Sequence, residues 1–238
     1  MSSRCLFLSI RLLWLAVPTL GWCAQPVDIV AYTEESAPYH YTENGKIVGT
    51  AADRLRAACA LAQLNCSLTS LPWARAMALA RQQADSLLFS IVRSPDRERD
   101  FIWLSPIATE EVWIFGRPGA PVVGSVGDLA RGRIGIINGS SGAAFLTQAG
   151  VPRSAMDFAN STEANMRKFA AHRVDFILST EGRLAKEVRR FQIPFQAQKV
   201  LRMQDATSYY AMHPQSTPWR VAALRGALQE LAARDQSK

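Results

Sequence analysis

Arg97 is the residue whose type and position best fit ligand recognition in this sequence. It lies shortly after the apolar run 86–92, which predicts a buried strand. A planar guanidinium near a strand end can bind a carboxylate through two parallel hydrogen bonds, and Ser90 would place a hydroxyl nearby. Arg93 and Arg99 compete for this role, and each of the three arginines also fits a surface position beside a neighbouring acid.

Gly139, Ser140 and Ser141 form a second candidate for carboxylate binding. They precede a helix-like stretch, and the free N–H groups and dipole at the start of a helix favour an anion. The same three residues also fit an ordinary helix cap. The chain therefore contains two separate carboxylate-binding candidates, which only the fold can bring together.

The histidines and the sequence motifs do not match the patterns typical of metal sites or enzyme active sites. His40, His172 and His213 are far apart, and none has the second histidine or cysteine three or four positions away that is typical of zinc sites. The sequence contains no Gly-x-Ser-x-Gly elbow, no Walker motif and no Gly-x-Gly-x-x-Gly after a strand. We therefore predict no catalytic residues, no metal and no cofactor.

The N-terminus, residues 1–24, has the pattern of a secretory signal peptide. Two arginines precede the apolar run 12–20, which is shorter than the about 20 residues that a membrane span takes. We predict cleavage after Ala24 and a periplasmic location. A lipoprotein is disfavoured, because Trp22 precedes Cys23 where lipidation wants a small residue.

Composition describes an exported globular protein with a modest basic excess. The chain has 238 residues, 48% hydrophobic and 20% charged, enough for one large domain or two lobes. Residues 1–24 hold two arginines and no acid, so their removal lowers the net charge from +7 to +5. The densest basic segment, 183–190, is interrupted by Glu187 and fits a solvated helix face better than a nucleic-acid patch. We expect a monomer that is not membrane-embedded and binds no nucleic acid.

Two cysteines remain after cleavage, Cys59 and Cys66. One lies near the end of an apparent helix and the other begins a strand. Because an exported chain meets an oxidising compartment, we predict that they form a disulfide that fixes this helix-to-strand corner. Two buried free thiols are the alternative.

Strand and helix patterns alternate twice along the mature chain, which favours the α/β class. The first series is strand 27–32, helix 51–64, strand 66–70, helix 73–83 and strand 86–92. The second is strand 112–115, helix 125–130, strand 133–137, a helix to 149, strand 156–158, helix 162–171, strand 174–178, helix 181–190 and strand 196–201. A strand at 208–212 and a helix at 218–232 complete the chain.

This order predicts two lobes, each with its own parallel-type sheet, joined by two extended hinge segments. We expect lobe 1 to comprise residues 25–110 plus 205–238, and lobe 2 to comprise residues 111–204. In a hinged pair of α/β lobes, ligands bind in the cleft where strand ends and helix starts converge. A small molecule between the lobes is therefore the expected partner.

The sequence resembles the extracytoplasmic solute-binding proteins of family 3, which serve ABC transporters of polar amino acids. Segment 32–49 is similar to the family's opening, with its aromatic-bearing "aPy" loop and "enGkivG". The other matching segments are 90–97 with Trp103, Ser105 and Pro106, which resembles "T-x-x-R" before "F-S-x-P", the turn 133–141, and 172–176, which resembles "GRvDa". The resemblance covers residues 26 to 232.

The resemblance implies a type II periplasmic-binding-protein fold and assigns roles to the two carboxylate-binding candidates. In it, Arg97 and Ser90 hold the α-carboxylate of a ligand, and Ser140 and Ser141 hold the same group from across the cleft. Closure of the lobes then becomes coupled to ligand. The spacing of the two cysteines also matches a disulfide common in the family.

The sequence departs from the family pattern at the position that usually receives the ligand's ammonium group. Many amino-acid binders have an acid there, whereas this chain has Thr180, followed by Glu181; Val92 also stands where a serine or threonine is frequent. Glu34 and Glu35 could supply the anionic partner, although exposed loop acids are often simply solvated.

Three aromatic residues, Tyr39, Trp73 and Trp103, are candidates for the cleft wall. Trp73 follows Pro72 at the start of a helix, where its ring could stack on a planar ligand or pack in the core.

These observations predict a periplasmic binding protein that captures a small carboxylate-bearing solute and passes it to an ABC importer. Two alternatives use the same fold. A periplasmic lyase would need a cleft acid with a raised pKa, for which Glu181 is the candidate. A ligand sensor would act in trans on another protein.

Overall fold

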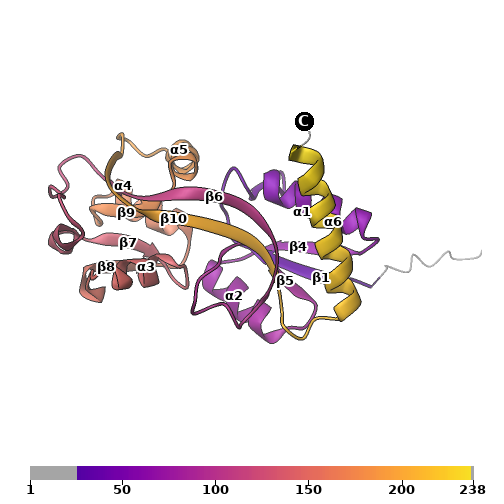
Figure 1. Ribbon diagram of the computed structural model, residues 1–238. Helices are drawn as coiled ribbons and strands as arrows, with labels where there is room; N and C mark the ends of the chain where they lie inside the picture. Colours follow the sequence, from indigo (N-terminus) through magenta and orange to yellow (C-terminus); the bar gives the residue numbers. More distant parts are fainter. Residues whose placement is uncertain (1–25, 237–238) are drawn as a thin grey trace, which may run out of the picture.

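The computed structural model describes residues 26–236, so the predicted signal peptide lies outside the described residues. Two lobes share one eight-stranded sheet in the order β4-β1-β5-β10-β6-β9-β7-β8 (Figure 1). Its strands are β1 (Ile29–Thr33), β4 (Cys66–Ser70), β5 (Ser86–Val92), β6 (Ile102–Gly116), β7 (Ile134–Ile137), β8 (Met156–Ala159), β9 (Phe176–Ser179) and β10 (Gln198–Met212). The helices are α1 (Thr50–Leu61), α2 (Trp73–Gln82), α3 (Gly142–Gln148), α4 (Thr162–Ala170), α5 (Glu181–Arg190) and α6 (Pro218–Gln236), with 3₁₀ turns at Val126–Arg131 and Arg153–Ala155 and a hairpin of β2 (Tyr41–Glu43) and β3 (Lys46–Val48).

Lobe 1 is built on β1, which pairs in parallel with β4 on one side and β5 on the other. Alternate residues of β1 enter different cores. Ile29 and Ala31 pack with residues of α1 and α6, whereas Tyr32 packs with residues of α2. Because successive strand residues point to opposite faces, the helices cover both sides of this sheet, as buried parallel strands require.

Lobe 2 repeats the same plan on β7, which pairs in parallel with β8 and β9. Ile134 and Ile136 pack with Leu146 of α3, and Ile177 packs with Met166 of α4 and Leu184 of α5. The apolar residues of each helix therefore lock it to the sheet, and its polar residues remain free to face the other lobe.

The antiparallel strands β6 and β10 run through both lobes (Figure 1). They pair from Gln198 opposite Gly116 to Met212 opposite Ile102, with several register shifts along the way. In lobe 1, β10 also pairs with β5, and in lobe 2, β6 also pairs with β9. The hinge segments expected from the sequence are therefore the middle parts of two long strands.

The structure corrects two details of the predicted layout. The strands expected at 196–201 and 208–212 are one strand, β10, and the strand expected at 112–115 is the end of the longer β6. As a result the two expected sheets are one sheet. Sequence patterns missed the continuity because the middle of each strand is polar and half-exposed, without the apolar run typical of a buried strand.

The lobe boundaries that we propose, between residues 110 and 111 and between 204 and 205, fall within this strand pair. Glu111 pairs with Asp205 there, so both crossings lie at the same level of the ladder. A pair of strands crossing together permits bending about a common line.

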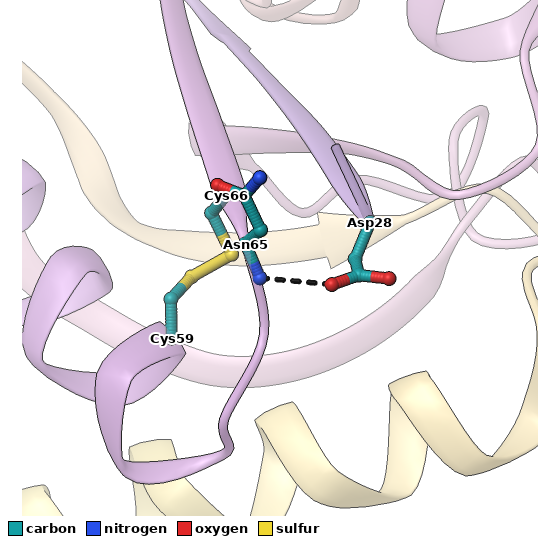
Figure 2. The surroundings of a disulfide bond; sticks show 4 residues. All are labelled: Asp28, Cys59, Asn65 and Cys66. Atoms are coloured by element: carbon teal, nitrogen blue, oxygen red, sulfur yellow. Dashed lines mark hydrogen bonds between the residues drawn. A yellow bond between two sulfur atoms is a disulfide. The ribbon is translucent and has the colours of Figure 1, made fainter. Parts of the chain in front are cut away.

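The predicted disulfide is confirmed: Cys59 of α1 is bonded to Cys66 at the start of β4 (Figure 2). At the same corner, the backbone N–H of Asn65 donates to the carboxylate of Asp28 at 2.9 Å. The guanidinium of Arg220 then joins Asp28 to Asp85, at 2.8 and 2.7 Å, which ties α6 to the strands of lobe 1. The disulfide therefore belongs to the frame of lobe 1, away from the cleft.

Replacing both cysteines with serine should destabilise the folded protein by about 2–3 kcal/mol, because the short crosslinked loop restricts the unfolded chain. For a chain of this length the melting temperature should fall by roughly 5–10 °C. Urea unfolding of the mature protein measures the loss, and the wild type under reducing conditions should match the variant. Equal stability of oxidised wild type and variant would contradict a stabilising role.

Candidate functional site

A cavity of about 150 Å³ lies where the two lobes and the hinge strands meet. Its wall comes from the loop after β1, from β5, from the middle of β6 and β10, and from β7, α3, α4, β9 and α5 of lobe 2. At 10–15 Å³ for each water-sized group, this space holds on the order of ten non-hydrogen atoms. The cavity therefore suits a small metabolite and is too small for a polymer.

Ser90 contributes an unpaired hydroxyl to the wall of this cavity. Its backbone lies in the left-handed region, with φ of 62°, although it sits within β5. This conformation is uncommon for a residue other than glycine and is typical of functional sites, where the surrounding fold maintains it. Within residues 26–236 the Oγ atom has no hydrogen-bond partner, so a ligand can supply one.

Arg97 is buried between the lobes and contacts the turn that was its predicted counterpart. Its Nη2 donates to the carbonyl of Gly139 at 2.9 Å, and its Nη1 donates to the carbonyl of Val92 at 3.4 Å. Burial lowers the pKa of the guanidinium, although Asp96 lies 4.0 Å away and acts in the opposite direction. Arg97 thus joins lobe 1 directly to lobe 2.

Trp73 makes a second hydrogen bond to the same carbonyl. Its indole Nε1 donates to Gly139 at 2.8 Å, while its ring packs in the core with Tyr32 and residues of α2. Of the two roles expected for Trp73, its ring therefore packs in the core, and its indole N–H also binds lobe 2. The Gly139 carbonyl of lobe 2 thus accepts two hydrogen bonds from lobe 1, one from Trp73 and one from Arg97, and both help to hold the lobes together.

Ser140, Ser141 and Tyr39 line the cavity, as does Thr180. The position of Tyr39 depends on Gly49, whose φ is 113° and where a Cβ atom would lie 2.6 Å from the Pro38 carbonyl. Because Gly49 has no side chain, the start of α1 can approach the loop that contains Tyr39. The Ala51 N–H of this helix donates to the Tyr39 carbonyl at 2.9 Å.

Glu110, in the middle of β6, supplies a carboxylate beside Thr180. The Thr180 hydroxyl donates to Glu110 Oε1 at 2.8 Å, and Tyr39 lies close enough for the Glu110 charge to act on it. Burial and the Glu110 charge raise the pKa of Tyr39 to about 12. A carboxylate therefore lies beside Thr180, supplied by a strand residue 70 positions earlier in the chain.

One face of α5 carries charged residues toward lobe 1. Arg183 Nε donates to Glu187 at 2.7 Å, and Arg183 Nη2 lies 3.7 Å from Glu34 of lobe 1. The spacing of four residues places Arg183 and Glu187 on the same side of the helix. Burial raises the pKa of Glu34 to about 7, aided by Glu187 and opposed by Arg183.

Glu35 lies outside the cavity described above, in a second, larger one of about 320 Å³ that shares Glu34 and Thr162 with the first. Its carboxylate forms an ion pair with Arg190 of α5 at 2.8 Å and accepts hydrogen bonds from Thr42 and Ser70. Although partial burial acts to raise it, these hydrogen bonds lower the pKa of Glu35 to about 2. Glu35 is thus a closure contact between the lobes.

Two further polar residues of the cavity wall, Asn165 and Ser179, went unnoticed in the sequence. Both are more than nine-tenths buried, and within the described residues Asn165 Oδ1 and Ser179 Oγ have no hydrogen-bond partner. A buried polar atom without a partner costs about 1–3 kcal/mol. Asn165 lies in an apparently ordinary helix, and no local signal distinguishes it.

The remaining candidates lie away from the cavity. Arg93 and Arg99 are exposed, and Arg93 pairs with Glu98. Trp103 donates to the Glu98 carbonyl at 3.3 Å within lobe 1. Glu181, the candidate acid of a lyase, is 74% exposed and pairs with Lys199.

Two structural properties concern residues 26–236 as a whole. None of their helices is both long and apolar enough to cross a membrane. Nor does this part of the chain contain a group of three or more histidine, cysteine or acidic residues that could hold a metal ion.

Comparison with known proteins identifies a family. Residues 29–237 match the profile of the bacterial extracellular solute-binding proteins, family 3. No curated protein sequence gives a significant match.

Solved structures with the same fold include binding proteins and a sensor. A histidine kinase sensor domain with similarity to periplasmic binding proteins has 17% identity and a TM-score of 0.78, over 88% of this chain and 92% of that one. The arginine-, lysine-, histidine-binding protein ArtJ of Geobacillus stearothermophilus has 19% identity and a TM-score of 0.77, over 89% and 91%. The amino acid ABC transporter substrate-binding protein AbpA of Streptococcus pneumoniae, bound to L-arginine, has 19% identity and a TM-score of 0.74, over 87% and 89%. These likenesses confirm the predicted two-lobed α/β fold.

Replacing Trp73 with phenylalanine should open the ligand-free protein. The ring is retained in the core, while the hydrogen bond to Gly139 across the cleft is lost. One hydrogen bond is worth about 1 kcal/mol, which lowers the ratio of closed to open molecules about fivefold. Small-angle X-ray scattering should show a larger radius of gyration. Trp103→Phe is the matched control, because its indole bonds only within lobe 1; identical scattering from all three proteins would contradict this role.

Replacing Glu34 with glutamine should remove a loss of folding stability that grows as the pH rises. The folded protein binds the Glu34 proton more tightly than the unfolded chain does, because its pKa is raised from 4.5 to about 7. The wild type should therefore lose stability relative to Glu34→Gln as the pH rises from about 4.5 to 7, by up to about 3 kcal/mol. Urea unfolding of both proteins at each pH gives this difference.

Comparison with the variant is needed because the buried His40 has the opposite effect. Burial lowers the pKa of His40 to about 4, so its contribution to stability is lost as the pH falls below about 6.5. Glu230→Gln, at an exposed position on α6, is the control and should show no such difference from the wild type. A flat difference for Glu34→Gln would show that Glu34 titrates normally.

Proposed function

Because the chain belongs to the bacterial extracellular solute-binding proteins of family 3, we propose that it captures a small carboxylate-bearing solute, an amino acid or a related compound, between its lobes. The observation that carries this proposal is the cavity itself. Both lobes and both long strands contribute to its wall, which includes Ser90, whose buried hydroxyl has no partner within the described residues. A solute held there contacts every part that moves when the cleft closes.

Carboxylate recognition is assigned to Arg97, Ser90, Ser140 and Ser141. Arg97 already donates to an acceptor of lobe 2, the Gly139 carbonyl, which directly precedes Ser140 and Ser141. A carboxylate offers a stronger, charged acceptor for the same guanidinium. A solute that takes over this donor would connect Arg97 to lobe 2 through itself, which couples capture to closure.

Glu110 is the proposed acceptor for a cationic group on the same solute. It lies in the strand β6, accepts a hydrogen bond from Thr180 and is near Tyr39. In this position it replaces the acid that many amino-acid binders have at the place of Thr180. Arg97 between the lobes and Glu110 in the cavity wall then offer charges of both signs, which favours a zwitterion such as an amino acid.

The proposed location is the periplasm, reached through the signal peptide at 1–24 without lipidation, and the proposed partner is the permease of an ABC importer. The protein would act there as a monomer without cofactor or enzymatic activity. Membership of a family of extracellular solute-binding proteins supports the proposed location.

A second candidate function is ligand sensing in trans, favoured by the similarity of the fold to a histidine kinase sensor domain. Uptake of labelled solute by cells lacking the protein distinguishes the two. Lost uptake supports the importer, whereas normal uptake with a lost transcriptional response to the solute supports the sensor.

Thermal unfolding against a panel of amino acids, polyamines, organic acids and aromatic acids tests capture directly. The mature chain is first refolded to remove bound solute. A solute at 100 times its dissociation constant should stabilise the protein by about 2.7 kcal/mol, which raises the melting temperature by several degrees.

Arg97→Ala should abolish the shift for a carboxylate-bearing solute, because it removes the charged donor. Arg93→Ala is the matched control, since Arg93 is exposed and pairs with Glu98. If no carboxylate in the panel shifts the melting temperature, or if both variants respond like the wild type, the proposal fails.

A further inference from the structure

We propose that the lobe 2 side of the cavity is a specificity subsite for an uncharged, hydrogen-bonding end group of the solute, such as a carboxamide or a urea. This inference rests on the proposed function, since it concerns the part of the solute that lies beyond its carboxylate. The subsite consists of Asn165 on α4, Ser179 on β9, and Arg183 and Glu187 on α5, and all four line the cavity.

The unpaired atoms of this subsite call for a partner that forms hydrogen bonds. Asn165 and Ser179 are 7% and 8% exposed, and in the described part of the chain Asn165 Oδ1 and Ser179 Oγ are without a partner. A hydrocarbon group placed beside them would leave both atoms unpaired. An amide and a hydroxyl each donate and accept, so the subsite suits a group that does the same.

The sequence of β7 leaves space for the Asn165 amide. Gly135 also lines the cavity and lies directly against the amide, because a Cβ atom at that position would be 2.3 Å from Asn165 Oδ1. Any side chain at position 135 would force the amide to move. The position of the amide at the cavity wall therefore depends on this glycine, which indicates a built site.

The charges within the subsite balance. Arg183 Nε donates to Glu187 at 2.7 Å, and Arg183 Nη2 donates to the Thr162 hydroxyl at 3.1 Å. The guanidinium is thus fixed, and Glu187, 6% exposed, neutralises it. A carboxylate on the solute would meet Glu187, and a cation would meet Arg183, so each carries a penalty that a neutral group avoids.

Glu34 closes the subsite from lobe 1, and with Glu187 it is one of the carboxyl groups that act on Arg183. It lies 3.7 Å from Arg183, and only 12% of its side chain is exposed. Burial raises its pKa to about 7, so near neutral pH a large part of the molecules carry an uncharged Glu34 that can donate a hydrogen bond. An elongated solute therefore has its charged groups at Arg97 and Glu110 and its neutral end here.

Isothermal titration calorimetry with two matched pairs of amino acids tests this subsite. Glutamine and glutamate have end groups of nearly the same size and shape, one neutral and one charged, and so do citrulline and arginine. We expect the neutral member to bind at least tenfold more tightly in both pairs. Equal or tighter binding of glutamate and arginine would overturn the inference.

Two variants locate the discrimination. Ser179→Ala and Asn165→Leu should each weaken binding of the neutral member five- to tenfold and reduce its advantage over the charged member. Ser94→Ala is the matched control, because Ser94 Oγ is also buried and unpaired in the described chain but lies outside the cavity wall. Ser179→Ala removes a single atom, so it tests the subsite even if Asn165→Leu does not fold.

The outcomes separate this inference from the proposed function. If all four amino acids bind in an Arg97-dependent way but neither variant changes their relative affinities, only the neutral subsite is overturned. If none of the four binds, the subsite falls together with amino acid capture.

Discussion

The antiparallel pairing of β6 with β10 is the interaction on which the arrangement of this protein depends. It extends from Met212 opposite Ile102 in lobe 1 to Gln198 opposite Gly116 in lobe 2, so the same ladder forms part of both lobes. Each lobe adds its own parallel strands to one side of this pair. The pairing therefore fixes how far apart the two lobes lie along these strands. Bending of the strand pair is then the main way in which the shape of the cavity can change. Glu110 sits on this ladder, so its carboxylate stays at the cavity while either lobe moves.

Apart from Ile137 of β7, which packs against the apolar cluster around Trp73, the contacts that close the cleft are polar, and several use side chains also assigned to the ligand. Arg97 and Trp73 donate to Gly139, while Arg190 pairs with Glu35. Polar contacts exchange readily with water or with another partner, because the net free energy of each is small. A closed cleft built this way can open to admit a solute. An apolar contact of similar area would favour permanent closure.

The fold was largely predictable from the sequence, because each α/β unit leaves a local signature. Apolar runs such as 86–92 and helix-period stretches such as 51–64 gave the elements, and the resemblance gave their assembly. The continuous course of β10 was missed, since its pairing with β6 stabilises polar residues that would not form a strand alone. Local patterns cannot reveal that kind of support, which comes from residues about 100 positions away.

The candidate site likewise contains residues that sequence motifs mark and residues whose contacts depend on distant parts of the chain. Ser90, Ser140, Ser141, Tyr39 and Thr180 were found because motifs mark them, and they line one cavity. The charged residues 183–190 were interpreted as a solvated helix face, although Arg183 and Arg190 contact Glu34 and Glu35 of the other lobe. A helix shows in its sequence which residues share a face; what that face meets depends on the opposite lobe. Glu110 illustrates the consequence: a missing acid at position 180 looks like a lost subsite in sequence, yet a hinge residue supplies the carboxylate that Thr180 now holds in place.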